Sequence, residues 1–182
     1  MPPPEPEFRS SPFPLRQQLA RLGWQTFCAV FMRPSPRPFH GWRSFCLRLW
    51  GARIGPGCRI YPGVIIWAPW NLECAENACV GDGAELYNPA PIWLGERSVV
   101  SQGAFLCTAS HDYEKVLLPL VAKAIRVGRD AWIGARAMVL PGCEIGEGSV
   151  IGLGSVVTRN TPPWSVCAGN PCRVVRERYT RE

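Results

Sequence analysis

The sequence lacks several features that define common functional classes of protein. Its purely apolar stretches are far shorter than the ~20 residues that a membrane-spanning helix requires. The first residues are proline-rich and acidic, without the apolar core of a signal peptide. The nine cysteines are an odd number and include no CxxC pair, which argues against a complete disulfide framework. We therefore expect a reduced, cytoplasmic protein.

Histidine is scarce as well. The 182 residues contain only His40 and His111, too few for a zinc site built from three distinct histidine ligands. We expect that no metal is required. The formal net charge of +6 favours an anionic ligand or partner. Nucleic acid is not expected, because the central part of the chain has no basic stripe interleaved with exposed aromatic residues.

What the chain does contain is a six-residue repeat that organises most of its length. Aliphatic residues recur every six positions from Val127 to Val157, and a small residue follows each of them by four positions, from Ala131 to Thr161. The same period appears earlier in three shorter runs, at 54–72, 80–92 and 94–106. A six-residue unit is too short to bury a core alone, so the units must stack on one another.

The spacing within each unit predicts a particular fold. The small residue and the next aliphatic residue are two apart, so in a strand both point inward. Cys58 and Cys143 fall in such inward positions, where cysteine acts as a compact apolar residue. The glycines then lie at corners, where the backbone adopts conformations that a side chain penalises. Three units per turn would make an all-β triangular prism. An ordinary β-sandwich is the alternative, but its strands would not keep one six-residue phase over so many units.

We expect three parts in the chain: a Pro-rich and helical capping segment over residues 1–52, the repeat solenoid over 53–162, and a basic tail over 163–182. A solenoid needs a cap, because its end would otherwise expose a bare core and an unpaired strand edge. A short helix from about Trp42 to Trp50, after a Pro-rich hinge at 34–38, is expected in that role.

Residues 15–32 carry a helical stripe of apolar side chains flanked by Arg16, Arg21 and Arg33. Packing of this helix on the end of the solenoid is the favoured interpretation. The alternative is an interfacial helix that lies on an anionic membrane, which would place the protein at the inner membrane face.

His111 lies where the repeat is interrupted. It follows Ser110, which we expect in an inward position, so alternation places His111 on the outer surface. The six-residue phase then stops and resumes at Val127, so residues 112–124 are expected to leave the prism as a projecting loop. This loop is largely apolar, and we expect it to pack over a neighbouring subunit and to wall off a cleft beside His111.

Several motifs resemble those of the hexapeptide-repeat O-acetyltransferases, the branch of the maltose, galactoside and nodulation-factor enzymes. They are Ser110-His111-Asp112-Tyr113, Trp132-Ile133-Gly134, residues 152–158 and residues 168–175. The segments 33–38 and 67–72 are closer still to acetyltransferases of colanic acid and exopolysaccharide synthesis. The resemblance covers residues 13–178. It implies a left-handed parallel β-helix, a handedness that would break the usual right-handed crossover preference.

The resemblance also implies direct transfer of an acetyl group from acetyl-CoA to a sugar hydroxyl of an exopolysaccharide or glycolipid intermediate. Such chemistry needs a base for the hydroxyl and a donor for the oxyanion. Histidine suits the first role, and His111 matches the family's catalytic residue. A carboxylate that orients the imidazole is expected, with Asp112 and Glu114 as local candidates.

The resemblance further implies a set of binding residues. Cofactor contacts are expected at Trp132, Gly134, Ala135, Leu153, Thr158, Arg159, Arg173 and Arg176, where arginines would hold the phosphates of CoA. Tyr87, Asn88 and Asp112 are the acceptor-side candidates. A solvated basic tail is the alternative for Arg173 and Arg176. The sugar-contacting N-terminal residues of the galactoside and maltose enzymes have no clear match, which favours a lipid-linked or polymer-bound sugar.

Other functions on the same repeat are less well supported. A γ-type carbonic anhydrase needs three zinc-binding histidines, and a sugar-nucleotide uridylyltransferase needs an additional phosphate-loop domain. An N-acetyltransferase acting on a nucleotide-linked amino sugar stays open, as does a non-catalytic scaffold. Because the CoA arm needs a groove with two walls, the expected assembly is the family's closed homotrimer.

Overall fold

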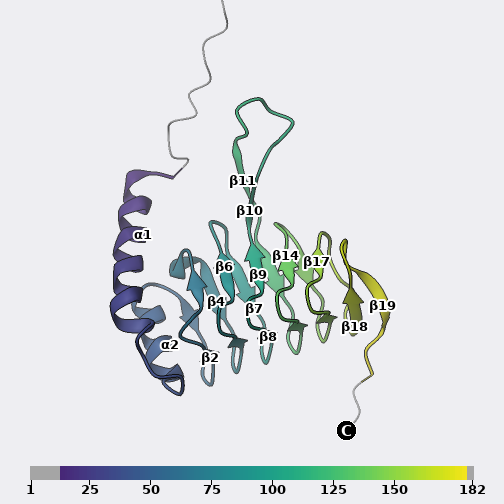
Figure 1. The fold of residues 1–182 in the computed structure, drawn as a ribbon, viewed down its shortest axis with the longest axis horizontal. Helices are drawn as coiled ribbons and strands as arrows, with labels where there is room; N and C mark the ends of the chain where they lie inside the picture. Colours follow the sequence, from purple (N-terminus) through teal and green to yellow (C-terminus); the bar gives the residue numbers. More distant parts are fainter. Residues whose placement is uncertain (1–12, 180–182) are drawn as a thin grey trace, which may run out of the picture.

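The chain is a left-handed parallel β-helix capped by helices at one end. The computed structural model describes residues 13–179. Short strands stack into three parallel sheets around a triangular core, and a single hairpin projects from the stack (Figure 1). The prism that the six-residue spacing predicts is therefore confirmed, as is the handedness that the family resemblance implies.

The three sheets form the three faces of the prism. Face A consists of β1 (Arg53–Ile54), β4 (Leu72–Cys74), β7 (Ile92–Leu94), β12 (Ile125–Val127) and β15 (Glu144–Ile145). Face B consists of β2 (Arg59–Ile60), β5 (Cys79–Val80), β8 (Val99–Val100), β13 (Trp132–Ile133), β16 (Val150–Ile151), β18 (Ser165–Ala168) and the antiparallel β19 (Arg173–Glu177). Face C consists of β3 (Ile65–Ile66), β6 (Glu85–Tyr87), β9 (Phe105–Cys107), β14 (Met138–Val139) and β17 (Val156–Val157). We name the corners edge AB, edge BC and edge CA after the faces that they join.

The core of the prism contains the aliphatic residues of the repeat. Ile60, Val100, Ile133 and Ile151 are completely buried, and Cys58 and Cys143 fill inward positions as predicted. Burial raises the pKa of both thiols, because the thiolate form loses its hydration. None of the nine cysteines, all of which lie within residues 13–179, forms a disulfide.

The breaks in the six-residue phase all occur at edge CA. Strand partners one coil apart are twenty residues apart in the first two coils, as for Arg53 and Glu73, but only eighteen for Arg126 and Glu144. The coil that contains the hairpin joins Trp93 to Arg126. Buried polar side chains hold the longer corners together: the Asn88 amide exchanges two hydrogen bonds with the backbone of Ala68.

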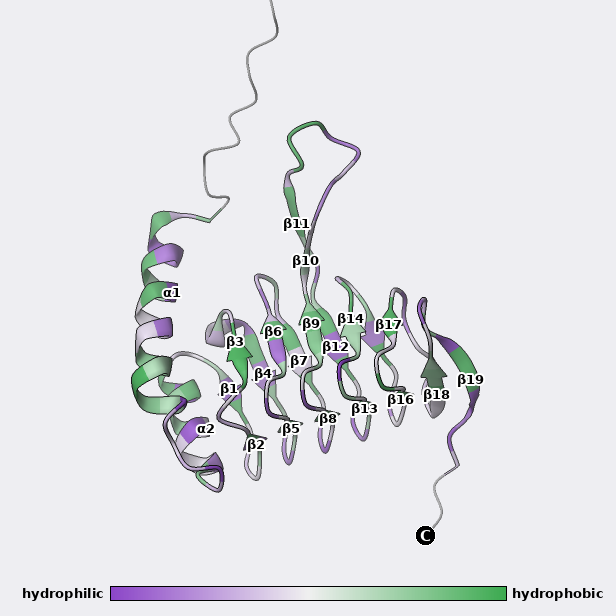
Figure 2. Ribbon diagram, viewed as in Figure 1, coloured by the Kyte–Doolittle hydropathy of each residue, from purple (hydrophilic) through white to green (hydrophobic). Residues whose placement is uncertain are grey.

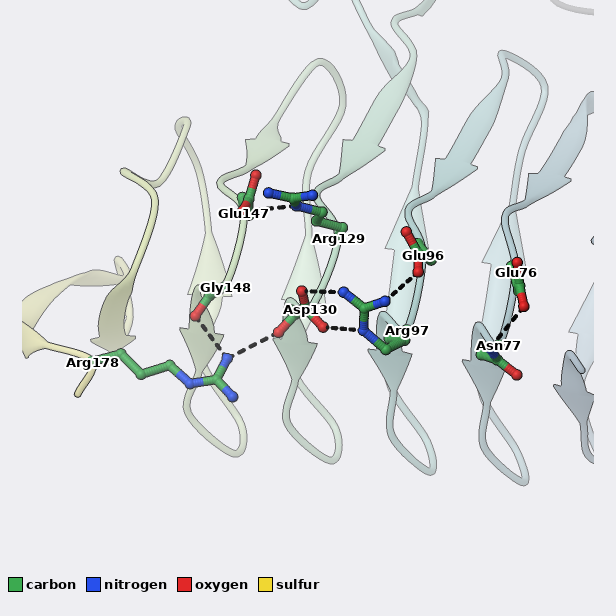
Figure 3. A network of polar contacts seen from close by, with 9 residues as sticks. All are labelled: Glu76, Asn77, Glu96, Arg97, Arg129, Asp130, Glu147, Gly148 and Arg178. Atoms are coloured by element: carbon green, nitrogen blue, oxygen red, sulfur yellow. Dashed lines mark hydrogen bonds and ion pairs between the residues drawn. The ribbon is translucent and has the colours of Figure 1, made fainter. Parts of the chain in front are cut away.

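Edge AB is a ladder of residues in the left-handed conformation. Asn77, Arg97 and Asp130 have φ values of 58°, 53° and 55°, so residues other than glycine also occupy these corners. The Asn77 side chain donates to Glu76 in its own coil, whereas Arg97 and Asp130 pair between coils. Figure 3 shows Arg97 bound to Asp130 by two hydrogen bonds of 2.7 and 2.8 Å, and this contact lowers the pKa of the Asp130 carboxyl.

The N-terminal cap consists of α1 (Leu15–Phe27), the π-helix η1 (Cys28–Met32) and α2 (His40–Leu49). A 3-10 turn, η2 (Pro69–Asn71), lies at edge CA of the first coil. The predicted packing of the first helix on the solenoid end is confirmed, because Trp24, Cys28 and Met32 are buried in the main core. The second predicted helix is also present and begins two residues earlier than expected. Within residues 13–179 no helix is both long and apolar enough to cross a membrane.

The cap supplies hydrogen-bond donors that a preceding coil would otherwise provide. In the solenoid, the carbonyl that ends each strand accepts an N–H from the coil before it, as Cys74 accepts from Gly55. The first coil has no such neighbour. Instead Arg48 Nε donates to Ile54 O at 2.9 Å, Arg43 Nε to Ile60 O at 2.6 Å, and Trp24 Nε1 to Ile66 O at 2.7 Å. Side chains of the cap thus satisfy the open strand end of each face, and His40 Nδ1 also lies 2.8 Å from Ile60 O.

The excursion from the repeat is a β-hairpin, formed by β10 (Ala109–His111) and β11 (Leu120–Ala122). It begins earlier than the predicted residue 112. The expectation of an inward Ser110 is wrong: Ser110 is exposed in β10, and Thr108 takes the buried corner position. The reason is the insertion at edge CA, which moves the inward position in this coil as it does in the two coils before it.

Candidate active site

His111 stands at the base of the hairpin, exposed on edge CA, and its ring is held by the opposite arm. Its Nδ1 lies 2.5 Å from the carbonyl oxygen of Leu118. A carbonyl oxygen can only accept, so Nδ1 carries the proton and donates it. In the neutral imidazole, the other ring nitrogen, Nε2, then has the lone pair. This is the tautomer that a general base acting through Nε2 requires.

Local backbone geometry places the Leu118 carbonyl. Leu118 has a φ of 45°, a left-handed conformation that a leucine rarely adopts. Two further backbone hydrogen bonds fix the hairpin around it: Leu118 N donates to Lys115 O at 3.0 Å, and Asp112 N donates to Pro119 O at 3.0 Å. The imidazole is therefore oriented by a peptide carbonyl in this chain, and sequence reasoning missed this residue.

The carboxylates expected beside His111 have other contacts. Asp112 accepts from the backbone N–H of Glu114 and pairs with Lys115 Nζ at 3.2 Å, so it stabilises the hairpin turn. Glu114 is exposed near the hairpin tip. Neither contacts the imidazole within this single chain.

The two other acceptor-side candidates lie on edge CA, but in different environments. Tyr87 is half-buried and contacts Trp67, edge to face, with 5.7 Å between ring centroids. Tyr87 pairs with Cys107 in the next coil, so these rings line the edge that leads to the hairpin. Asn88 is completely buried, and both of its amide atoms are bonded to Ala68. In this chain Asn88 joins coils and does not reach the surface.

The residues expected to line the CoA pantetheine lie along face B and edge BC. Trp132 is half-exposed on β13, and its indole Nε1 donates to Ser101 Oγ at 2.8 Å, which fixes the ring against the surface. Ala135 and the strongly exposed Leu153 follow at the corners of successive coils. Gly134 is buried, and a Cβ added there would lie 2.5 Å from the backbone oxygen of Ile151. It permits close stacking of the coils and presents no side chain to a ligand.

The residues expected at the phosphates of CoA are exposed and divide between two places. Arg173 and Arg176 lie on β19, at the C-terminal end of face B. The guanidinium groups of both donate only to nearby backbone carbonyls, those of Cys172 and Glu177. Thr158 and Arg159 lie at edge CA, two coils beyond the hairpin. Arg178, which directly follows β19, has a structural role, since it donates to the carbonyls of Asp130 and Gly148 at edge AB (Figure 3).

These positions form two groups on different edges of one prism. His111 and Tyr87 lie on edge CA, whereas Ala135 and Leu153 lie on edge BC, with the whole of face C between them. A base on one edge and a pantetheine wall on the other cannot meet within one subunit. Over residues 13–179 no cluster of histidine, cysteine or acidic side chains is arranged to hold a metal ion.

Known proteins are similar to this chain in both sequence and fold. The family model described as "Bacterial transferase hexapeptide (six repeats)" matches residues 124–159. A protein of Escherichia coli K12 named "Putative colanic acid biosynthesis acetyltransferase WcaF" is 40% identical over 162 residues, 89% of this chain and 88% of that protein.

Two solved structures show the same architecture. A galactoside acetyltransferase in complex with coenzyme A superposes with a TM-score of 0.83 at 26% identity, covering 92% of this chain and 84% of that one. The hexapeptide-repeat acetyltransferase VCA0836 of Vibrio cholerae, complexed with acetyl coenzyme A, gives 0.83 at 21% identity, with 93% of each chain covered.

The match to the Escherichia coli relative covers 89% of this chain, far more than the 124–159 segment that the family model matches. The chain therefore belongs to the hexapeptide-repeat acetyltransferase family and is an acyltransferase.

Proposed function

We propose that this enzyme transfers an acetyl group to a hydroxyl of a sugar in an exopolysaccharide or glycolipid intermediate, with His111 as general base. The observation that carries the proposal is the hydrogen bond from His111 Nδ1 to the Leu118 carbonyl, which leaves Nε2 as a proton acceptor on an exposed edge. The colanic acid assignment of the Escherichia coli relative supports a polysaccharide-related acceptor.

The reaction needs only one transfer. Nε2 takes the proton of the acceptor hydroxyl as its oxygen attacks the thioester carbon, and the Leu118 carbonyl stabilises the imidazolium that forms. The tetrahedral oxyanion then collapses, the carbon–sulfur bond breaks, and the imidazolium returns the proton to the thiolate of CoA. No acyl-enzyme forms in this scheme, so no nucleophilic serine or cysteine is involved.

On the donor side, Trp132, Ala135 and Leu153 would line the pantetheine along edge BC. Arg173 and Arg176 are exposed and have no acidic partner among the described residues, which fits a role in binding phosphates. Thr158 and Arg159 would approach the nucleotide end from the other edge.

The separation of the two groups supports a homotrimer with sites between subunits. One subunit would contribute His111 from edge CA, and its neighbour would contribute the pantetheine wall from edge BC. The hairpin supports this arrangement, since Tyr113 and Val116 at its tip are each 84% exposed in the single chain. Apolar side chains so exposed are expected to pack on another surface.

The test is thiol release from acetyl-CoA in the presence of sugars and lipid-linked saccharides, comparing the natural protein with His111→Ala. We expect acceptor-dependent release that falls by at least about 10²-fold in the variant. Calorimetry with CoA should show unchanged binding, because the variant leaves the donor wall intact.

Three outcomes would contradict the proposal. Release that survives in a folded His111→Ala variant would remove the general-base role. Release with amino sugars alone would show an N-acetyltransferase, and absence of CoA binding would indicate a scaffold.

A further inference from the structure

The helical cap has an apolar surface that faces away from the solenoid. On α1, Leu15, Leu19 and Leu22 follow the spacing i, i+4, i+7, opposite the buried Trp24. On α2, Trp42, Phe45 and Leu49 follow the spacing i, i+3, i+7, opposite the buried Leu47. We call these six residues the cap face, and their exposed fractions range from 41% for Trp42 to 70% for Leu15.

The two stripes belong to one rigid unit. The indole Nε1 of Trp42 donates to the carbonyl of Phe31 at 2.8 Å, which ties α2 to the end of η1. Phe31 and Val30 extend the apolar surface, since both are about half exposed. Figure 2 shows hydrophobic turns along α1, which crosses the end of the coil stack roughly at right angles to the stacking direction. A flat surface laid on this end would therefore meet α1 along its side.

The charges around the cap face have a single sign. From Phe13 to Leu72 the chain contains eight arginines and no lysine, aspartate or glutamate: Arg16, Arg21, Arg33, Arg37, Arg43, Arg48, Arg53 and Arg59. Arg16 in α1 and Arg33 at the end of η1 are exposed, whereas Arg37 lies over the ring of Tyr61 on the solenoid. The first acidic residue after this segment is Glu73, in the second coil.

From these observations we propose that the cap face docks on an anionic lipid bilayer. Exposed leucines, phenylalanine and tryptophan with arginines at their margin are the composition of interfacial helices. Each arginine near the surface is attracted by anionic headgroups. A second copy of the chain fits poorly, because two cap faces would bring the same uncompensated arginines together. The helices are too short and polar to span, so the contact lies on the surface.

The docking is independent of the transfer chemistry and can be measured without it. The probe is flotation of the full-length protein with vesicles of phosphatidylcholine containing about 30% phosphatidylglycerol. We expect binding to these vesicles, little binding to phosphatidylcholine alone, and release in about 0.5 M NaCl.

Variants distinguish the cap face from non-specific adsorption. Leu19→Gln/Phe45→Gln should bind the anionic vesicles at least about tenfold more weakly, since two apolar side chains no longer insert. Arg16→Gln/Arg33→Gln should bind more weakly and with a smaller salt effect. The matched control is Val116→Gln, which removes an apolar side chain from the hairpin, away from the cap, and should bind like the natural protein. Thermal melting checks that each variant is folded.

Several outcomes would overturn the docking. They are absence of binding by the natural protein, equal binding by a folded cap variant, or equal loss in the hairpin control. A cap variant that sediments as a smaller species, with vesicle binding absent throughout, would show that another subunit covers this face.

Discussion

The functional role proposed for His111 depends on a backbone atom seven residues away. The Leu118 carbonyl can accept from Nδ1 only because Leu118 adopts a positive φ at the hairpin turn. A β-branched residue disfavours that conformation more strongly than leucine does, whereas glycine adopts it freely.

Replacing Leu118 with valine should therefore lower activity about tenfold, because the left-handed conformation costs about 1–2 kcal/mol and the carbonyl turns away from the ring. Leu118→Gly is the matched control and should keep most of the activity. Steady-state rates and CoA affinity measure both variants. If the valine variant is fully active, or the glycine variant is equally impaired, the carbonyl does not orient the base.

For individual residues, the sequence predicted which side chains belong to the candidate site but not the backbone geometry around them. The position of His111 at the interruption of a period follows from counting residues. Its exposure is confirmed, but not by the alternation that predicted it, because Ser110 is exposed as well. The role of the Leu118 carbonyl could not be predicted from the sequence. Every residue has a backbone carbonyl, and the direction of this one depends on a turn that no motif specifies. Asn88 shows the converse. Its motif position suggested a ligand contact, but burial at an inserted corner engages both of its amide atoms within the chain.

Among the elements, the cap shows how a repeat begins without a preceding copy. The need for a cap and its helical character were predictable from the amphipathic pattern. The pairing of side-chain donors of the cap with the carbonyls of the first-coil strands was not predictable, because these hydrogen bonds join residues 6 to 42 positions apart.

Arg43 is the most buried of these donors, and it also donates to Ser35 Oγ and to the carbonyls of Pro36 and Arg37 in the Pro-rich hinge. We expect Arg43→Met to destabilise the fold by about 3 kcal/mol, because several buried carbonyls lose their donor. Arg53→Met is the matched control on the solenoid surface, where the side chain is 82% exposed. Thermal unfolding of the two variants checks this: similar midpoints would show that the cap carbonyls are satisfied in another way.

For the whole molecule, the two separated groups of site residues predict activity shared between subunits. Neither His111→Ala nor Arg173→Glu/Arg176→Glu should be active alone, since one lacks the base and the other repels the CoA phosphates. Dissociated and reassembled together in equal amounts, they should recover about a quarter of the natural activity. Half of the sites would receive an intact His111, and half of those would also receive intact CoA-binding arginines from the neighbouring subunit.

Sedimentation of the mixture verifies reassembly, and mixing without dissociation is the control. A reassembled mixture with no activity would place the whole site within one chain. The sequence predicted the trimer from the family resemblance and from the need for a groove with two walls, and the structure adds the positions of two half-sites on different edges.

The hairpin projects from the third coil, so the two coils before it set the distance of His111 from the capped end of the prism. Successive coils are about 4.8 Å apart, so His111 lies about 10 Å beyond the first coil, and the helical layer adds about 10 Å more. On a protein docked end-on through its cap face, the acetylated hydroxyl would then be about 20 Å above the lipid headgroups. An acceptor held by a lipid would have to extend that far, which selects for several linked sugars over a single residue. Inserting or removing one twenty-residue coil between the cap and the hairpin would change this reach by one strand spacing and leave the catalytic geometry untouched.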